Sequence, residues 1–220
     1  MNQAIDSTRA DSLKALLDYN SAQLEEHKQL RCFQFFTDGT LDDPQKRELF
    51  LTCLQALARH FQTIIFMRQA HCADARYASI FARHLREEIG HDEVLRQDRG
   101  RADDLWDPVI EAVGAWFASS MSNLDNVAKL AVVHLVLETS GAHMGSLSRR
   151  TMPRYGSAKY FELHDEVDDS HVSLAIGPLE SQSSETLEGL REVVSHAWQM
   201  MNTWGDRVAS IVLGTVPALR

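Results

Sequence analysis

Apolar residues recur along the chain with a period close to that of an α-helix, and no stretch alternates with a period of two. The pattern therefore predicts helices and no sheet. Asp-Pro pairs at 43–44 and 107–108 suit a helix cap followed by the first helical position. Ser7 or Thr8 is expected to cap the first helix, and Gly177-Pro178 to end the sixth. The predicted helices cover about 7–30, 44–71, 75–99, 107–121, 124–150, 157–177 and 185–213.

The segment 44–71 illustrates the pattern, because its apolar residues fall on one face. We expect these side chains to point inward: Leu49, Leu54, Leu57, Phe61, Ile64 and Ile65. Segments of this kind, joined by short connections, predict an all-α fold. We expect a single domain covering residues 1–220, built as a bundle of about seven helices.

Composition narrows the class of protein. The chain has 220 residues, 44% of them hydrophobic, with few prolines and glycines and no linker-like stretch. A net charge of −9 argues against nucleic acid or an anionic membrane as partner. Without a long apolar run or a signal-peptide pattern at the N-terminus, we expect a cytoplasmic protein. Cys32, Cys53 and Cys72 have no C-x-x-C spacing and are expected to be apolar filler.

One segment carries candidate metal chemistry. His164, Asp168 and His171 lie in "FELHDEVDDSH", at offsets of four and three residues. At about 100° per residue, a helix would place all three on one face. Two imidazoles and a carboxylate suit a borderline metal such as iron, although a solvated acidic face explains part of the pattern.

Two further segments carry candidate ligands. Glu88 and His91 lie in "HLREEIGHDEVL", a pair that by itself is more often a surface or capping pair. Glu138 is a lone acid in "LAVVHLVLETSGAHMG", and burying it is costly unless a proton, an arginine or a metal neutralises it. Together, the three segments predict a metal site. Mixed imidazole and carboxylate ligands favour iron or manganese over structural zinc, and paired carboxylates favour two ions.

With these motifs, "EEIGH", the isolated Glu138 and "HDEVDDSH", the chain resembles the heme-oxygenase-like diiron oxidases from about 44 to 213. These are non-heme relatives of the heme oxygenase and thiaminase II helical scaffold. The resemblance implies that Glu88 and His91 hold a first iron and that Glu138 bridges to a second. It assigns the second iron to His164, Asp168 and His171.

The chain departs from the family pattern in one place. Some members have a glutamate seven residues before the histidine that corresponds to His91. This chain has His84 at that position. We expect His84 to lie next to the metal without binding it, and a role as a ligand is the second alternative. Whether Glu87 or Glu88 is the ligand stays open. His164 and His171 would be about 10 Å apart along a straight helix, so we predict a distortion between 165 and 170.

The resemblance implies an O2-dependent non-heme diiron oxidoreductase with two ferrous ions and O2 as cosubstrate. Family members hydroxylate nitrogen, cleave C–C bonds, desaturate or form nitriles, mostly on amino acids or fatty acids. We expect a small-molecule substrate, in a biosynthetic pathway, that is an amino acid or a derived metabolite. Arg149, Arg150 or Lys159 could bind its carboxylate, although each is more usual as a surface cation.

Other functions stay open at this stage. They are a fatty-acid oxidase, a heme oxygenase using His27, a thiaminase II-like hydrolase using a cysteine, and a non-enzymatic iron-binding protein. We expect no nucleic-acid or membrane partner, and a homodimer is possible.

Overall fold

The computed structural model describes residues 2–101, 103, 105–156, 159–163, 171 and 173–216. Side chains are described from Thr8 onward. The described residues form helices and no strand, which confirms the predicted all-α fold. The elements are α1 (Asn2–His27), α2 (Arg31–Gln34), η1 (Thr40–Asp42), α3 (Pro44–Ala70), α4 (Ala75–Glu88), α5 (His91–Arg99), α6 (Pro108–Asn123), α7 (Asn126–Leu130), η2 (Ala131–Leu137), α8 (Glu138–Thr151), η3 (Met152–Tyr155), α10 (Ile176–Glu180) and α11 (Ser184–Val212).

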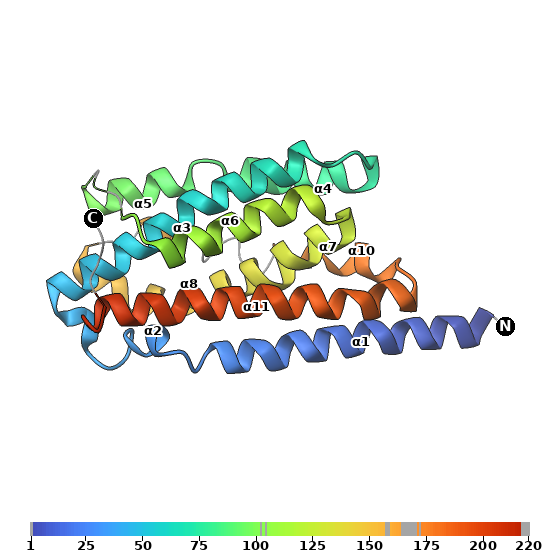
Figure 1. The fold of residues 1–220 in the computed structure, drawn as a ribbon, viewed down its shortest axis with the longest axis horizontal. Helices are drawn as coiled ribbons and strands as arrows, with labels where there is room; N and C mark the ends of the chain where they lie inside the picture. The colour runs from blue at the N-terminus through green and yellow to red at the C-terminus, as the bar shows by residue number, and fades with distance from the viewer. Residues whose placement is uncertain are drawn as a thin grey trace.

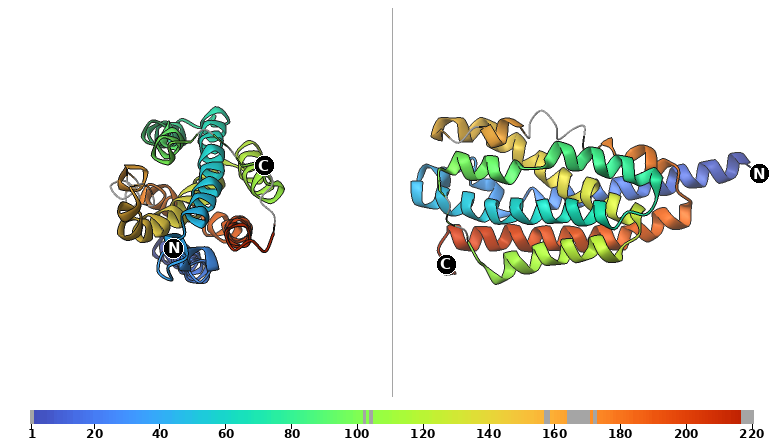
Figure 2. Two further views of the ribbon diagram at one scale, coloured as in Figure 1. Left: turned by 90° about the vertical axis from the view of Figure 1, so that its left-hand side faces the viewer. Right: turned by 90° about the horizontal axis from the view of Figure 1, so that it is seen from above.

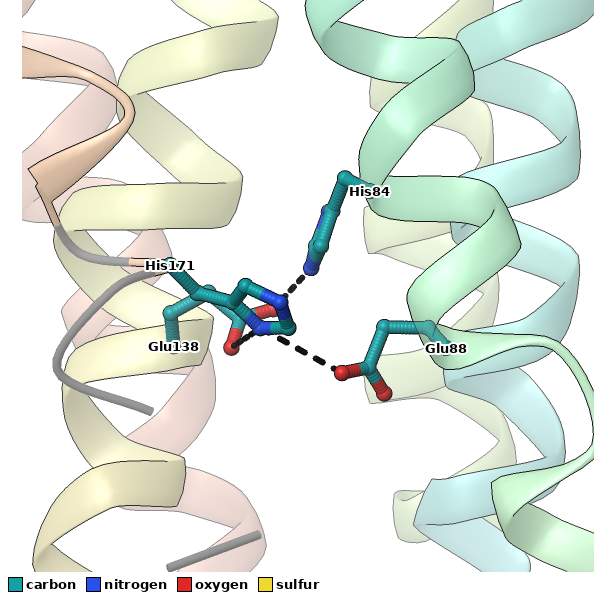
Figure 3. Close-up of side chains that lie close together, drawn as sticks. All are labelled: His84, Glu88, Glu138 and His171. Atoms are coloured by element: carbon teal, nitrogen blue, oxygen red, sulfur yellow. Dashed lines mark hydrogen bonds and ion pairs between the residues drawn. The ribbon is translucent and has the colours of Figure 1, made fainter. Parts of the chain in front are cut away.

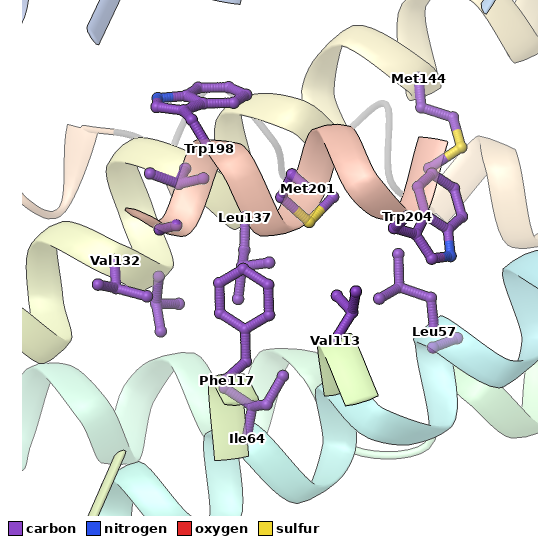
Figure 4. Close-up of a cluster of buried hydrophobic side chains, with 14 of the residues drawn as sticks. Leu57, Ile64, Val113, Phe117, Val132, Leu137, Met144, Trp198, Met201 and Trp204 are labelled. Carbon is purple, nitrogen blue, oxygen red and sulfur yellow. The ribbon is translucent and has the colours of Figure 1, made fainter. Parts of the chain in front are cut away.

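The long helices lie side by side (Figures 1 and 2), and α3 packs against α4, α5, α6 and α11. Helix α1 lies along α11, and its N-terminal end extends beyond the other helices. The core between α3, α6, η2 and α11 is filled by large apolar side chains (Figure 4), which include Ile64, Phe117, Leu137, Trp198 and Trp204. Burial of this apolar surface is the main force that holds the helices together.

The two Asp-Pro starts are confirmed. The Asp43 side chain accepts hydrogen bonds from backbone N–H groups in the first turn of α3, and Asp107 does the same for α6. These caps satisfy N–H groups that have no partner inside the helix. Asp107 is also held by an ion pair to Arg207 at 2.6 Å, which ties the start of α6 to α11.

Two predicted helices have an interruption. The helix expected over 75–99 is two helices, because Gly90 adopts the left-handed conformation with φ 88° between α4 and α5. Glycine adopts this conformation without a steric penalty. The helix expected over 124–150 contains η2, a π-helix of seven buried residues. Its wider turns were not visible in the apolar pattern.

Two predicted helix ends are wrong. Helix α1 already begins at Asn2, so neither Ser7 nor Thr8 caps it. Gly177 and Pro178 do not end a helix but lie in the first turn of α10. Proline is tolerated there because its missing N–H would have no partner inside the helix. The predicted distortion between 165 and 170 lies outside the described residues.

Helix α3 is long and apolar enough to cross a membrane by length and composition alone. However, half of its most apolar 18-residue stretch is buried inside the bundle. The structure therefore gives α3 the place of a core helix. Cys32 and Cys53 are buried and Cys72 is half-buried, all three as free thiols, which agrees with a role as filler.

Candidate metal centre

Four side chains meet in the interior of the bundle: His84, Glu88, Glu138 and His171, here called the His/Glu cluster (Figure 3). Each offers one potential ligand atom, and these atoms all lie within 4.8 Å of one another. All four residues are at most 5% exposed. Two carboxylates so far from water need a compensating positive charge.

Helix α4 supplies one wall of the cluster. His84 and Glu88 are four residues apart and therefore share a face of this helix. The left-handed Gly90 then turns the chain, so that His91 begins α5 with its Nδ1 at 2.9 Å from Glu88 Oε2. The side chain of Gln62 fixes this break, since it donates to the Glu88 carbonyl at 2.9 Å and accepts from the Gly90 N–H at 3.0 Å.

The opposite wall comes from the end of the π-helix. Glu138 is the first residue of α8, directly after η2. Its Oε1 lies 2.9 Å from His84 Nε2, and its Oε2 lies 3.3 Å from His171 Nδ1. The same His171 nitrogen is 3.3 Å from Glu88 Oε1. Single π-helical turns are rare and occur often at functional sites.

The carboxylates set the charge state of the cluster. Burial alone would raise the pKa of Glu138, but the neighbouring imidazoles of His84 and His171 hold it well below 4.5. Burial alone would lower the pKa of His171, but Glu138, Glu88 and Glu87 outweigh burial and raise it above 6.5. The carboxylates therefore favour the protonated form of His171. A metal ion would compete with that proton, because a ligand histidine must be neutral.

A buried arginine lies behind the cluster. Arg68 of α3 is 0% exposed, and its Nη2 and Nη1 contact His84 Nδ1 at 2.6 Å and His134 Nε2 at 3.1 Å. Burial lowers the pKa of Arg68 to about 10, which leaves it charged at neutral pH. Burial and the Arg68 charge lower the pKa of His134 well below 6.5, so His134 is neutral.

The cluster fits a metal ion. Glu138 Oε1 is buried 2.9 Å from His84 Nε2, yet it has no well-directed hydrogen bond among the described residues. Such unsatisfied buried atoms are uncommon in folded proteins and need an explanation. Carboxylate and imidazole donors without thiolate suit iron or manganese. A divalent ion between the carboxylates would be a partner for Glu138 Oε1 and would offset the negative charge of both groups.

Three of the six predicted ligands, Glu88, Glu138 and His171, are brought together. His91 contacts Glu88 but lies outside the group of four, and His164 and Asp168 lie outside the described residues. Glu88 rather than Glu87 belongs to the buried cluster. The side chain of Glu87 is 31% exposed and reaches His171 Nε2 at 3.1 Å from the rim. That these residues bind metal stays a prediction.

Sequence reasoning left His84 undecided and overlooked Arg68 and His134. The His-x3-Glu spacing of His84 and Glu88 could have placed His84 on the ligand face of its helix. A single arginine within the apolar stretch "TIIFMRQA" could have indicated a buried cation. The contact between Arg68 and the histidines depends on how α3, α4 and η2 pack, which the sequence does not display.

A cavity of about 80 Å³ lies beside the cluster and reaches Glu88, His91 and Glu138. Its other walls are mainly apolar, formed among others by Leu54, Leu57, Phe61, Leu137, Met144 and Met201. No arginine or lysine of the described chain lines it, and Arg149, Arg150 and Lys159 are exposed instead. The cavity therefore suits the apolar part of a small molecule rather than a carboxylate.

The candidate heme ligand is already paired. His27 is buried, with Nδ1 at 2.7 Å from Asn202 Oδ1 and Nε2 at 2.8 Å from Ser140 Oγ. Burial lowers its pKa to about 4. Both ring nitrogens are used in hydrogen bonds, so neither is free to bind a heme iron in this arrangement.

Two of the three cysteines are buried thiols with raised pKa values. Burial raises the pKa of Cys32 and of Cys53 to about 12, which disfavours the nucleophilic thiolate. The thiol of Cys72 donates to the Asp74 carbonyl at 3.4 Å. None of the three lines the cavity.

Comparison with known proteins supports the fold and leaves the activity open. No family model matches the chain. An uncharacterized protein of Rickettsia prowazekii (strain Madrid E) is 22% identical over 198 residues, which cover 90% of this chain and 94% of that protein. A TenA homolog from Pseudomonas syringae pv. tomato superposes with a TM-score of 0.74 at 16% identity, covering 90% of this chain and 92% of that one.

A second solved structure carries the same architecture. It is a domain of unknown function with a heme oxygenase-like fold from Shewanella denitrificans, with a TM-score of 0.63 at 15% identity. The match covers 98% of this chain and 93% of that domain. The fold is therefore heme-oxygenase-like, as the sequence predicted.

Proposed function

We propose that this chain is an O2-dependent non-heme diiron oxidoreductase that oxidises a small molecule, with an amino acid or an amino-acid-derived metabolite as the first candidate. The observation that supports it most directly is the His/Glu cluster, in which two buried carboxylates and two imidazoles converge on one point. Enzymes of this chemistry need oxygen and nitrogen ligands held together away from water.

In this proposal, Glu88 and His91 hold one iron and Glu138 bridges to the other. His171, together with His164 and Asp168, holds the second iron. The 2.9 Å distance between His91 Nδ1 and Glu88 Oε2 supports the first pair, because both atoms can face one ion. The bridging role of Glu138 is supported by His171, whose Nδ1 lies 3.3 Å from Glu138 Oε2 and 3.3 Å from Glu88 Oε1.

Ferrous ions held by these residues would supply the electrons that activate O2 for oxidation of the substrate, and an external reductant would return them to the ferrous state. The protein's share is to hold the donors and to place the substrate. Gln62 fixes the turn between Glu88 and His91. The apolar walls of the cavity exclude water and would hold the substrate's apolar body next to Glu88 and Glu138. The mainly apolar lining leaves a fatty-acid-type substrate as the alternative.

Oxygen uptake by the iron-loaded protein tests the proposal. The protein is loaded anaerobically with ferrous iron and mixed with O2, a reductant and a panel of amino acids, apolar amines and fatty acids. We expect uptake above the substrate-free rate with at least one class of compound, abolished by an iron chelator. Substrate turnover that persists with the chelator, or iron-loaded protein without uptake on any class, would contradict the assignment.

A further inference from the structure

The contact between Arg68 and His84 restricts where the histidine proton can be. A guanidinium group has only N–H donors and no acceptor. Because Arg68 Nη2 lies 2.6 Å from His84 Nδ1, that nitrogen must present a lone pair. A neutral imidazole has one proton, so the proton of His84 is on Nε2.

Arg68 also contacts a ring nitrogen of His134, and that nitrogen must likewise accept the hydrogen bond. Nη1 lies 3.1 Å from His134 Nε2, so His134 also accepts a hydrogen bond from Arg68. The ring of His134 lies 4.8 Å from that of His84, and the guanidinium group lies 4.4 Å from the centre of the Phe81 ring. These neighbours hold the guanidinium from several sides. Arg68 is therefore fixed in place and cannot turn away from His84 without leaving buried N–H groups unpaired.

The proton on Nε2 then faces the cluster, where Glu138 Oε1 is 2.9 Å away. To bind a metal through Nε2, His84 would have to lose the proton from that nitrogen. The ring would then be an imidazolate with no proton on either nitrogen, or the proton would have to move to Nδ1, where it would face an N–H group of Arg68. Histidines that bind metals usually donate from the other nitrogen to an acceptor. Here the other nitrogen faces a donor, which is the opposite arrangement.

We propose that Arg68 is a positioning residue that fixes His84 as the Nε2–H tautomer, so that His84 presents a proton rather than a lone pair to the cluster and is not a metal ligand. This inference rests on the proposed function only for the metal itself. Glu138, Glu88 and His171 would bind metal, and the carboxylate of Glu138 keeps both oxygens available for it. His84 is close to these three side chains because Arg68 holds it there.

The tautomer can be measured without any metal. Two-bond 15N–1H correlation spectra of the metal-free protein, labelled at histidine, distinguish a protonated from an unprotonated ring nitrogen. The His84 signals are assigned by their absence in His84→Gln. We expect Nε2 to be protonated and Nδ1 unprotonated at neutral pH. A proton on Nδ1, alone or together with one on Nε2, would overturn the proposal.

Two arginine variants test the cause. Arg68→Met should shift His84 toward a mixture of tautomers, because the donor facing Nδ1 is gone. Arg99→Met is the matched control, since Arg99 is also buried but pairs with Glu48 at 2.9 Å, away from the cluster. We expect the control to leave the His84 spectrum unchanged. If Arg68→Met does not fold, the wild-type spectrum still decides the question.

Metal content gives the independent test. In His84→Gln, the amide oxygen can accept from Arg68 and the amide nitrogen can donate toward Glu138, but the side chain is a poor iron ligand. We expect its iron content per chain to equal that of the wild type. A loss of one iron or more would overturn the proposal. Wild-type protein that binds no iron would instead contradict the proposed function, and the tautomer measurement would still stand on its own.

Discussion

Helix α8 contributes to two buried histidine clusters that differ in how well their hydrogen bonds are satisfied. Ser140 belongs to the His27 cluster, formed by His27, Ser140 and Asn202, in which each nitrogen of His27 has a partner within 2.8 Å. Glu138, two residues earlier, belongs to the His/Glu cluster, where buried carboxylates and an undirected Nε2–Oε1 contact remain.

The comparison shows what distinguishes a structural polar group from a binding site. The His27 cluster is neutral and complete, so nothing needs to be added to it. The His/Glu cluster instead holds two buried carboxylates, which raise the pKa of His171, and Glu138 Oε1 lacks a directed hydrogen bond among the described residues. Buried carboxylates with an unsatisfied oxygen are what a cation site looks like before the cation binds.

The largest effect is expected at Glu138. Glu138→Ala removes the carboxylate that lies between His84 and His171, and iron content should fall to background in an elemental analysis of the purified, iron-loaded protein. Ser140→Ala is the matched control on the same helix. It removes a hydrogen bond to His27, at a cost of about 1 kcal/mol in unfolding free energy, and should keep its iron. Equal iron content in both variants would remove the distinction between the clusters.

A stability effect is expected from His27. Its pKa is about 4 in the folded protein and 6.5 in the reference state, so the unfolded chain takes up the proton first as the pH falls. The unfolding free energy should therefore decrease from pH 6.5 to 4, by roughly 3 kcal/mol from this group alone. His27→Gln has no such proton to bind.

Urea unfolding of both proteins at several pH values isolates this contribution, because other titrating groups cancel in the difference. The wild type should lose more stability than His27→Gln between pH 6.5 and 4. Parallel curves would show that His27 is not the buried neutral group described above.

The smallest effect is expected at the rim of the His/Glu cluster. Glu87→Gln weakens the contact to His171 Nε2 but leaves the buried carboxylates in place. Iron affinity should fall by roughly tenfold, with the number of ions unchanged, since residues that orient metal ligands have effects of about 10- to 100-fold and Glu87 is partly exposed. An iron titration measures both quantities. Complete loss of iron would place Glu87 among the ligands.

Much of the fold could be predicted from local patterns. The starts at Asp43 and Asp107 are local, because a cap and a proline at the next position act within one helical turn. The break at Gly90 was missed because the apolar pattern continues across it, while the left-handed conformation is decided by packing and by the hydrogen bonds from Gln62.

The candidate site could be predicted only in part. The Glu-x-x-His spacing indicates Glu88, and Glu138 is recognisable as the lone acid of an apolar helix. Both features can be read directly from the sequence. The role of Arg68 was not visible, since it depends on α3, α4 and η2 meeting at one point. The pairing of His27 is not visible in the sequence either, because Ser140 and Asn202 lie more than 100 residues away along the chain.

Anomalous diffraction from crystals grown anaerobically with ferrous iron tests the central claim most directly. We predict two iron peaks next to the Glu138 carboxylate, on the side of Glu88 and His171, and none at His27. Iron-loaded crystals with no peak at Glu138, or with a peak at His27, would contradict the account.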